Sequence, residues 1–415
     1  MTVHLLGPIQ LEEEVERLIE WLATFGKTEK GGVTRLLYSE QWLSAQEALK
    51  EKMEECGLAP YFDDVGNLFG RAEGSSPSSK TILTGSHIDT VIEGGKYDGA
   101  YGIIAGLLAT HYLLKRFGTP KKTIEVVSLC EEEGSRFPLT FWGSGSVTGR
   151  RSFKHIQKIV DSKGISFVQA MNECGFGQER FRQPFRNDIQ CFIELHIEQG
   201  SVLEKKKKSL GIVSDIVGQR RYQVKVVGES NHAGTTPMSC RKDAVAIASE
   251  LITYLMKQAK QVCDQLRVTV GKIKVEPNVP NVIAGEVVFT IDIRHHEEEL
   301  LEQFCSTFSR HFKNVSAQYN VDILLNEWLN VKPVKMDQQL LRLSKEIAEE
   351  QNLSHEILVS GAGHDSQMFG TYCPTALFFV PSHNGISHSP KEYTSAAHLE
   401  SGVKFLIHYL YRLAY

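Results

Sequence analysis

Two different patterns of apolar residues follow one another along the chain, and the change between them restricts the possible folds most. Outside the middle of the chain, stretches at helical spacing alternate with short apolar runs, which lie at 81–83, 123–130, 191–195 and 375–380. Strands that alternate with helices indicate an α/β sheet covered by helices on both faces. The middle of the chain follows the order β-α-β-β-α-β, which is typical of a ferredoxin-like α+β unit.

We therefore predict an inserted domain of residues 215–330 within a larger α/β domain of residues 1–214 and 331–415, whose central sheet is mixed. A length of 415 residues suits two domains better than a single small core. In the insertion the spacing predicts helices at 243–262 and 297–313 and strands at 221–228, 267–275, 286–294 and 317–325.

The charge and the cysteines exclude several classes of partner. The chain has 46 basic and 50 acidic residues, a formal net charge of −4, so we expect no nucleic-acid partner and no binding to an anionic membrane. The N-terminal residues show no secretion signal, and no apolar stretch is long enough to cross a bilayer. Eight scattered cysteines without a C-x-x-C pair indicate reduced thiols. The sequence therefore predicts a cytoplasmic protein.

Histidines and acids recur where the predicted strands of the larger domain end. Side chains after strand ends in an open α/β sheet gather at one edge, where ligands bind. Neutral imidazole and carboxylate are common ligands of divalent metals, and a second acid such as Asp89 can hold the other ring nitrogen of a ligand histidine. The candidate metal ligands are His87, Asp98, Glu133, His196 and His388.

Each of these residues has an ordinary explanation when taken by itself. A single histidine after a strand is more often a surface or core residue, and the acids of Glu131–Glu133 resemble a solvated loop. The same kind of residue at the same kind of strand end, repeated several times, favours a metal site over these explanations.

Several long motifs resemble the amidase branch of the zinc-dependent aminoacylase/carboxypeptidase superfamily. This branch contains allantoate amidohydrolases and N-carbamoyl-L-amino acid hydrolases, and the resemblance extends over the whole chain. The motifs are GSHIDT at 85–90, GGKYDG at 94–99, EEEGSRFP at 131–138, ELHIEQG at 194–200, NHAGTTPM at 231–238, DIR at 292–294, GAGHDS at 361–366 and GISHSP at 385–390.

The resemblance implies two divalent metal ions per subunit, zinc or manganese, with cobalt also possible. Asp98 would bridge both ions, His87 and His196 would complete one site, and Glu133 and His388 the other. Glu132 would be the general base that takes a proton from water and passes it to the departing nitrogen.

The resemblance also assigns residues of the insertion. His232 would be catalytic, and Arg221, Asn281 and Arg294 would bind substrate, with Gln199 as a further contact and His364 as a weaker one. In proteins of this kind such residues can reach the active site of the other subunit, so the resemblance implies a homodimer formed through the inserted domain. The exposed sheet edges of such an insertion also favour pairing across a two-fold axis.

The resemblance leaves the substrate open between ureido compounds that carry a carboxylate. Segments 135–144 (SRFPLTFWGS) and 218–222 (GQRRY) look like those of the allantoate enzymes rather than the carbamoylases. In the second segment, a polar Gln-Arg pair suits a second ureido group. We therefore expect hydrolysis of a ureido C–N bond of allantoate, with release of ammonia and carbon dioxide. The alternatives are an N-carbamoyl-L-amino acid hydrolase, a dipeptidase or aminoacylase, and a metal-free binding protein of the same fold; the last would be favoured by a missing ligand, and none is missing.

Overall fold

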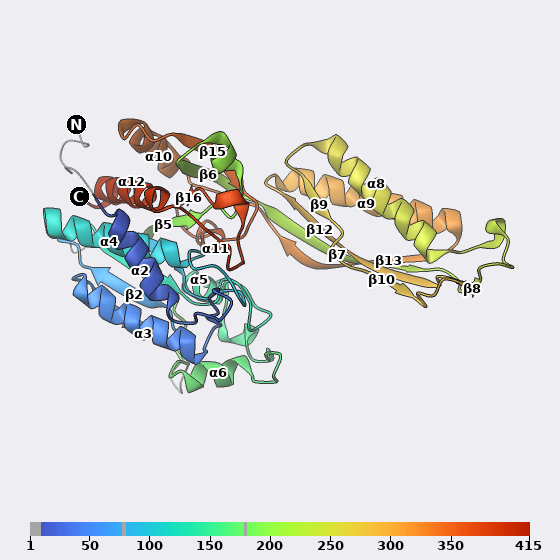
Figure 1. Ribbon diagram of the computed structural model, residues 1–415, viewed down its shortest axis with the longest axis horizontal. Coiled ribbons are helices and arrows are strands. Elements are labelled where there is room, and N and C mark those ends of the chain that lie inside the picture. The colour runs from blue at the N-terminus through green and yellow to red at the C-terminus, as the bar shows by residue number, and fades with distance from the viewer. Residues whose placement is uncertain (1–9, 77–79, 178–180) are drawn as a thin grey trace. The chain divides into compact units, whose positions relative to one another are not determined.

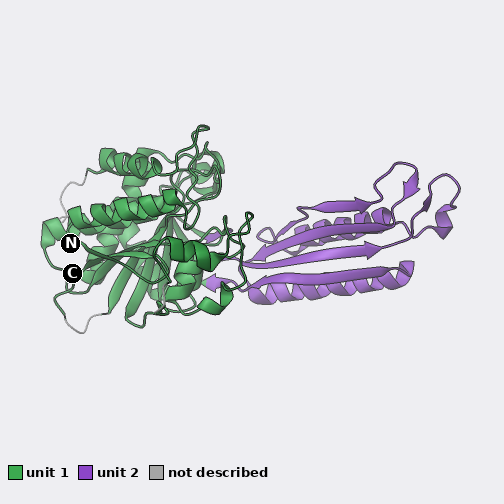
Figure 2. Ribbon diagram, turned by 90° about the horizontal axis from the view of Figure 1, so that it is seen from below, with its two compact units in different colours: residues 1–214, 335–358, 362–415 green, residues 215–334, 359–361 purple. Residues whose placement is uncertain are grey.

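The computed structural model describes residues 10–76, 80–177 and 181–415, and the chain forms two compact units (Figure 2). Unit 1 comprises residues 1–214, 335–358 and 362–415, and unit 2 comprises residues 215–334 and 359–361. Residues 1–9 lie outside the described residues. They begin the N-terminal segment that we searched for a secretion signal.

Unit 1 is built on a sheet with the strand order β1-β2-β4-β3-β5-β16-β6-β14, in which β15 also pairs with β6. Neighbouring strands are parallel from β4 to β16, whereas β1, β2 and β6 pair antiparallel, so the sheet is mixed. The strands are β1 (Ala59–Phe62), β2 (Leu68–Ala72), β3 (Thr81–His87), β4 (Ile124–Leu129), β5 (Ile189–Ile197), β6 (Leu210–Ile216), β14 (Val334–Lys335), β15 (His355–Ser360) and β16 (Thr375–Val380).

Helices cover both faces of this sheet (Figure 1). The alternation along β5 shows this, because the ring of Phe192 stacks on Phe369 of α11, whereas Leu195 approaches α4 and α12 from the other face. The helices of unit 1 are α2 (Glu12–Ala23), α3 (Glu40–Glu55), α4 (Ala100–Phe117), α5 (Trp142–Val147), α6 (Phe167–Glu173), α7 (Val202–Lys206), α10 (Gln338–Glu350), α11 (Asp365–Phe369) and α12 (Ala396–Ala414).

Unit 2 has a second, antiparallel sheet in the order β10-β12-β7-β13, with β9 beside β12, and its apolar face is covered by α8 and α9 (Figure 1). A two-stranded sheet pairs β8 with β11. The elements are β7 (Gly218–Val227), β8 (Asn231–His232), α8 (Ala244–Val262), β9 (Arg267–Thr269), β10 (Ile273–Glu276), β11 (Val282–Ile283), β12 (Glu286–His295), α9 (Glu298–Tyr319) and β13 (Asp322–Val331).

The predicted fold class, a mixed α/β sheet with helices on both faces and an α+β insertion, is confirmed. Three elements in the insertion differ from the prediction. The strand expected at 267–275 is two short strands, and Gly271, a residue that weakens strands, lies in the break. The helix expected at 297–313 continues to Tyr319 and ends at Asn320, whose left-handed backbone (φ 48°) stops it, so the last strand begins later than expected.

Among the described residues, no helix has the length and apolar character that crossing a bilayer requires. All eight cysteines lie in the described part of the chain and are free thiols.

Candidate metal centre and active site

The five candidate metal ligands lie together at one edge of the unit 1 sheet. His87 is the last residue of β3, His196 is the second-last residue of the neighbouring β5, and Glu133 follows β4 by four residues. Asp98 precedes α4, and His388 follows β16 in the C-terminal loop. Parallel strands bring these loops to a common edge, as the sequence predicted.

One group of possible ligands joins His87, Asp98 and His196, all of which are buried. The Oδ1 atom of Asp98 lies 3.5 Å from Nε2 of His87 and 3.2 Å from Nε2 of His196. Both imidazoles thus direct the same nitrogen towards one carboxylate oxygen.

Backbone carbonyls fix the tautomers of these two histidines. Nδ1 of His87 lies 3.0 Å from the carbonyl oxygen of Asp89, and Nδ1 of His196 lies 2.9 Å from that of Ile197. If each Nδ1 carries the proton and donates it to the carbonyl, Nε2 of the neutral ring presents a lone pair to Asp98. Gly99 N–H donates to Nε2 of His196 (3.1 Å), which agrees with this assignment. Lone pairs directed at a carboxylate suit a shared cation, so this donor set fits a divalent metal.

The second group joins Asp98 with Glu133 and His388. Nε2 of His388 lies 3.2 Å from Oδ2 of Asp98 and 3.4 Å from Oε1 of Glu133. Asp98 therefore uses one oxygen in each group, which is the arrangement expected of a bridging carboxylate. Gln199 also contacts this group, because its Nε2 donates to Oδ2 of Asp98 (2.9 Å).

The charges at the site favour a cation as well. Burial would raise the pKa of Asp98, but hydrogen bonds from protonated His196, His388 and His87, which supply the positive charge that a metal ion would otherwise supply, hold it well below its ordinary value. Burial, followed by the negative charge of Asp98, raises the pKa of Glu133 to about 7. Acids that repel one another this strongly in a buried site are compensated when a cation binds between them.

Gly99 allows the first turn of α4 to reach His87. Its backbone is left-handed (φ 64°), and a Cβ atom at this position would lie 2.4 Å from the carbonyl oxygen of His87 and 2.5 Å from its ring. Only glycine accommodates both the backbone angle and this close approach. The Tyr97-Asp98-Gly99 motif therefore fixes Asp98 against the end of β3.

Three non-glycine residues with left-handed backbone also lie in the loops of the site, namely Glu131 (φ 53°), Gln199 (φ 54°) and His388 (φ 54°). Such conformations are uncommon for these residue types and cluster at functional sites. The turn at Glu131 changes the chain direction directly before Glu132 and Glu133.

Glu132 belongs to neither ligand group among the described residues, and it lies beside Glu133 in the loop after β4. Burial raises the pKa of Glu132 well above its ordinary value, and the nearby His87 offsets only part of this shift. A carboxylate with a raised pKa next to a metal site is suited to accept a proton.

Asp89 holds this loop in a way that differs from our expectation. We expected its carboxylate on the His87 ring, but the nearest carboxylate oxygen is 3.7 Å from Nδ1, and the backbone carbonyl takes the ring contact instead. The two carboxylate oxygens accept the backbone N–H groups of Glu132 and Glu133, each at 3.1 Å. Asp89 therefore links the loop of His87 to the loop of the acids.

His364, the weaker substrate candidate, is buried beside the first ligand group. Its ring lies 4.7 Å from that of His196 and 5.2 Å from that of Phe379. Burial lowers the pKa of His364 well below its ordinary value, and His196 lowers it further. These surroundings favour the neutral form of the ring.

In unit 2, Arg221 and Arg294 lie on either side of Asp292. Nε of Arg221 donates to Oδ2 of Asp292 (2.8 Å) and Nε of Arg294 donates to Oδ1 (2.9 Å), while Gln219 Nε2 donates to Oδ2 (2.6 Å). Burial would raise the pKa of Asp292, but the two arginines lower it below its ordinary value. One acid between two arginines leaves a net positive charge, which suits a substrate carboxylate.

His232 and Asn281 are neighbours elsewhere in unit 2. Val282 pairs with His232, and the carbonyl of Asn281 accepts Ala233 N–H (3.1 Å). Nδ1 of His232 accepts the N–H groups of Gly234 (3.0 Å) and Thr235 (3.2 Å), so the neutral ring carries its proton on Nε2. His232 is exposed and presents this Nε2–H as a donor.

The structure does not bring all the insertion residues together. β7 and β12 pair along their whole length, from His295 opposite Gly218 to Glu286 opposite Val227, and Arg294 lies opposite Gln219 near the first of these ends. Eight residue steps of strand span roughly 27 Å, and His232 lies beyond the far end of β7 (Figure 1). Within one unit 2, the Asp292 cluster and His232 are therefore at opposite ends of the sheet.

Two arginines from the segments that suggested the substrate have structural contacts. Arg220 is buried and pairs with Glu298, because strand alternation turns it to the helix-covered face, away from Gln219 and Arg221. Arg136 donates to Asp161 and to the carbonyls of Leu37 and Tyr38. Gln219 therefore shares a sheet face with Arg221 and not with Arg220.

Sequence reasoning missed Glu392, which accepts the backbone N–H groups of Tyr97 and Asp98. Its only sequence signal is an acid shortly after the GISHSP motif. Such an acid reads as an ordinary loop residue until the two loops are placed side by side.

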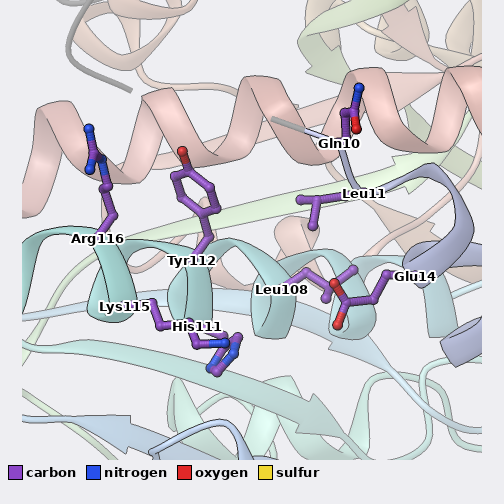
Figure 3. Close-up of a pocket in the computed structure, with 8 residues that line it drawn as sticks. All are labelled: Gln10, Leu11, Glu14, Leu108, His111, Tyr112, Lys115 and Arg116. Carbon is purple, nitrogen blue, oxygen red and sulfur yellow. The ribbon is translucent and has the colours of Figure 1, made fainter. Parts of the chain in front are cut away.

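A separate pocket of about 600 Å³ lies along α4, away from the strand ends (Figure 3). It contains one acid, Glu14, and one histidine, His111, whose Nδ1 lies 2.9 Å from the carbonyl of Cys56. Neither belongs to a ligand group among the described residues. The lining residues are Gln10, Leu11, Glu14, Leu108, His111, Tyr112, Lys115 and Arg116.

The two ligand groups that share Asp98 at the strand ends of a mixed sheet are those of a metal-dependent enzyme. Comparison with known proteins agrees: the model of peptidase family M20/M25/M40 matches residues 83–412. The chain belongs to this family, whose members include hydrolases of non-peptide C–N bonds.

Individual relatives cover almost the whole chain. An allantoate amidohydrolase from Bacillus subtilis (strain 168) is 50% identical over 98% of this chain and 99% of its own. An N-carbamoyl-L-amino-acid amidohydrolase from Pseudomonas sp. (strain NS671) is 37% identical over 95% of this chain and 96% of its own. The crystal structure of an amidase of the hydantoinase/carbamoylase family from Burkholderia multivorans has a TM-score of 0.91 and 31% identity, covering 97% of this chain and 98% of that one.

Proposed function

We propose that this enzyme hydrolyses a ureido C–N bond of allantoate, with two divalent cations per chain, zinc or manganese, and releases ammonia and carbon dioxide. The observation that carries the chemistry is the pair of ligand groups that share Asp98, with Glu132 beside them. The choice of allantoate rests on sequence identity. The chain is 50% identical to the allantoate amidohydrolase and 37% identical to the N-carbamoyl-L-amino-acid amidohydrolase.

The ligands would be His87 and His196 for one ion, Glu133 and His388 for the other, and Asp98 for both. When bound, the cations polarise the ureido carbonyl and make the attacking water more acidic. Glu132 takes the proton of this water and returns it to the departing nitrogen. Nε2–H of His232 donates to the carbonyl oxygen as negative charge develops there.

Arg294 and Arg221 bind the substrate carboxylate, with Asn281 and Gln199 as further polar contacts. Gln219 shares a sheet face with both arginines. Its Nε2 donates to Asp292, so its carbonyl oxygen is the atom that would accept an N–H group of a second ureido. A carbamoyl amino acid has no second ureido and would leave Gln219 without that partner. This difference favours allantoate over the runner-up.

A substrate panel tests the proposal. Protein stripped of metal and reloaded with zinc, manganese or cobalt is assayed on allantoate, N-carbamoyl-L-amino acids and dipeptides. We expect kcat/KM for allantoate to exceed that for the other substrates by at least about 10²-fold, because unpaired polar groups penalise an analogue that lacks the ureido. A preference for N-carbamoyl amino acids with every cation would replace allantoate by the runner-up.

We further infer that two copies of the chain form a homodimer through unit 2. A small substrate cannot contact both His232 and Arg294 of one unit 2, because the length of β7 separates them. Two copies remove this difficulty, since His232 and Asn281 of one chain complete the site that the other chain's arginines line. The strand β13 is at the edge of its sheet and exposes Leu324 and Trp328, which supports association there.

Mixing two inactive variants tests this arrangement. In a mixed dimer of Glu132→Gln and His232→Ala chains, one site has both defects and the other is intact. Random subunit exchange should restore about a quarter of the parental activity, because half of the dimers are mixed and each has one intact site. A mixture of Glu132→Gln and Asp98→Ala is the control and should stay inactive, since both residues belong to unit 1. No recovery in the first mixture, after exchange is demonstrated, would show that His232 does not act across the interface.

The eight free thiols support a reducing compartment, and we propose that the enzyme works in the cytoplasm.

A further inference from the structure

Glu392 connects two loops that carry metal ligands. Its Oε1 accepts the backbone N–H groups of Tyr97 and Asp98, each at 3.1 Å. Its Oε2 accepts a hydrogen bond from the hydroxyl of Ser387 at 2.7 Å. Ser387 directly precedes His388 in the chain. One carboxylate is thus bonded to the loop of Asp98 and to the loop of His388.

The surroundings leave Glu392 little freedom. Its side chain is buried, and Gly95 packs so closely that a Cβ atom there would lie 2.0 Å from Oε1. The GGKYDG motif therefore needs glycine at this position to admit the carboxylate. Ser387 continues the network, because its hydroxyl is also 3.4 Å from Oδ2 of Asp98.

We propose that Glu392 is a positioning residue that sets the separation of Asp98 and His388 and so holds the second cation site, formed by Asp98, Glu133 and His388, ready for its ion. This inference rests on the proposed two-cation function.

The first site depends less on Glu392. Its histidines, His87 and His196, are end residues of two paired strands, and backbone carbonyls orient both rings. His388 lies in a loop, its backbone is left-handed, and its side chain is 48% exposed. Beside the direct approach of Ser387 and His388 to Oδ2 of Asp98, the hydrogen bond from Ser387 to Glu392 joins this loop to the backbone of the Asp98 loop. Loss of Glu392 should therefore affect the two sites unequally.

The test is calorimetric titration of metal-stripped protein with Mn²⁺, in which the parent should bind two ions. Glu392→Ala should weaken one of the two binding events by about 10–100-fold, the range typical of lost outer-shell contacts, and leave the other nearly unchanged. The weakened event should be the one that His388→Ala also weakens. Glu392→Gln should remain close to the parent, because its amide oxygen still accepts two N–H groups and its NH₂ donates to Ser387.

Glu204→Gln is the matched control. Glu204 also holds the C-terminal loop, through Asn384 N–H and His383, but it touches no metal ligand. Its variant should bind both ions as the parent does, and thermal unfolding of the metal-free proteins checks the fold. Gly95→Ala displaces the Glu392 carboxylate in another way and should weaken the same binding event. It replaces Glu392→Ala as the test if the Glu392→Ala protein does not fold.

Two outcomes overturn the inference: parental affinity at both sites in a folded Glu392→Ala or Gly95→Ala protein, or equal loss at both. If the parent itself binds only one ion, the proposed two-cation function fails rather than the role of Glu392.

Discussion

Glu132→Gln is expected to lower kcat by about 10²–10⁴-fold, the contribution typical of a general base, while both cations stay bound. Glutamine has the same shape but accepts no proton. The loop should keep its place, because Asp89 holds it through backbone N–H groups that the substitution leaves intact. The measurement is kcat together with metal content by elemental analysis.

Glu131→Gln is the control for this substitution. Glu131 is buried in the same loop, and burial followed by the charge of Asp89 raises its pKa well above the ordinary value, as burial also does for Glu132. Because Glu131 belongs to neither ligand group of the described residues, exchanging its side chain for an amide of equal size should leave kcat close to that of the parent. A Glu132→Gln protein that retains parental kcat would remove Glu132 from the mechanism.

Asp98→Ala is expected to abolish tight binding of both cations and to reduce kcat/KM by at least about 10³-fold, because several kcal/mol of transition-state stabilisation depend on the metals. The reason is geometric, since Oδ1 faces His87 and His196 while Oδ2 faces His388. His388→Ala removes a ligand from one group only and should still retain one ion per chain. Elemental analysis after gel filtration distinguishes the variants, and two retained ions in Asp98→Ala would rule out the bridge.

The gathering of the candidate ligands at one edge of the sheet was predictable from sequence because it follows a rule of sheet geometry. His87 and His196 end neighbouring strands, and parallel strands deliver their last residues to one edge. For these two histidines, a position at the carboxyl end of a parallel strand determines which edge of the sheet the side chain reaches. Asp98 was identified from its motif ahead of the long apolar helix and from the family resemblance, whereas the close approach of Gly99 to His87 is visible only in the structure.

The remaining contacts depend on loops whose paths no local pattern determines. Glu392 and Asp98 are almost three hundred residues apart, and only the folded chain reveals their hydrogen bond. The same holds for Asp89, whose side chain reaches the acid loop rather than the ring two residues before it.

In the insertion, the sequence identified polar residues but not their separation. His232 and Arg294 occur in motifs of the same domain, yet antiparallel pairing places them at opposite ends of a ten-residue strand pair. Alternation likewise separates Arg220 from Arg221, which sequence alone presents as one basic pair. These distances follow from register, which is set by pairing across the sheet.

The central claim is that one carboxylate serves two cation sites at the strand ends of unit 1. Titration of metal-stripped protein with Mn²⁺, followed by electron paramagnetic resonance, tests it most directly. The account predicts two bound ions per chain and a spectrum of exchange-coupled manganese, because ions that share Asp98 lie within about 4 Å of each other. A single ion per chain, or two ions that give only the spectrum of isolated Mn²⁺, would contradict it.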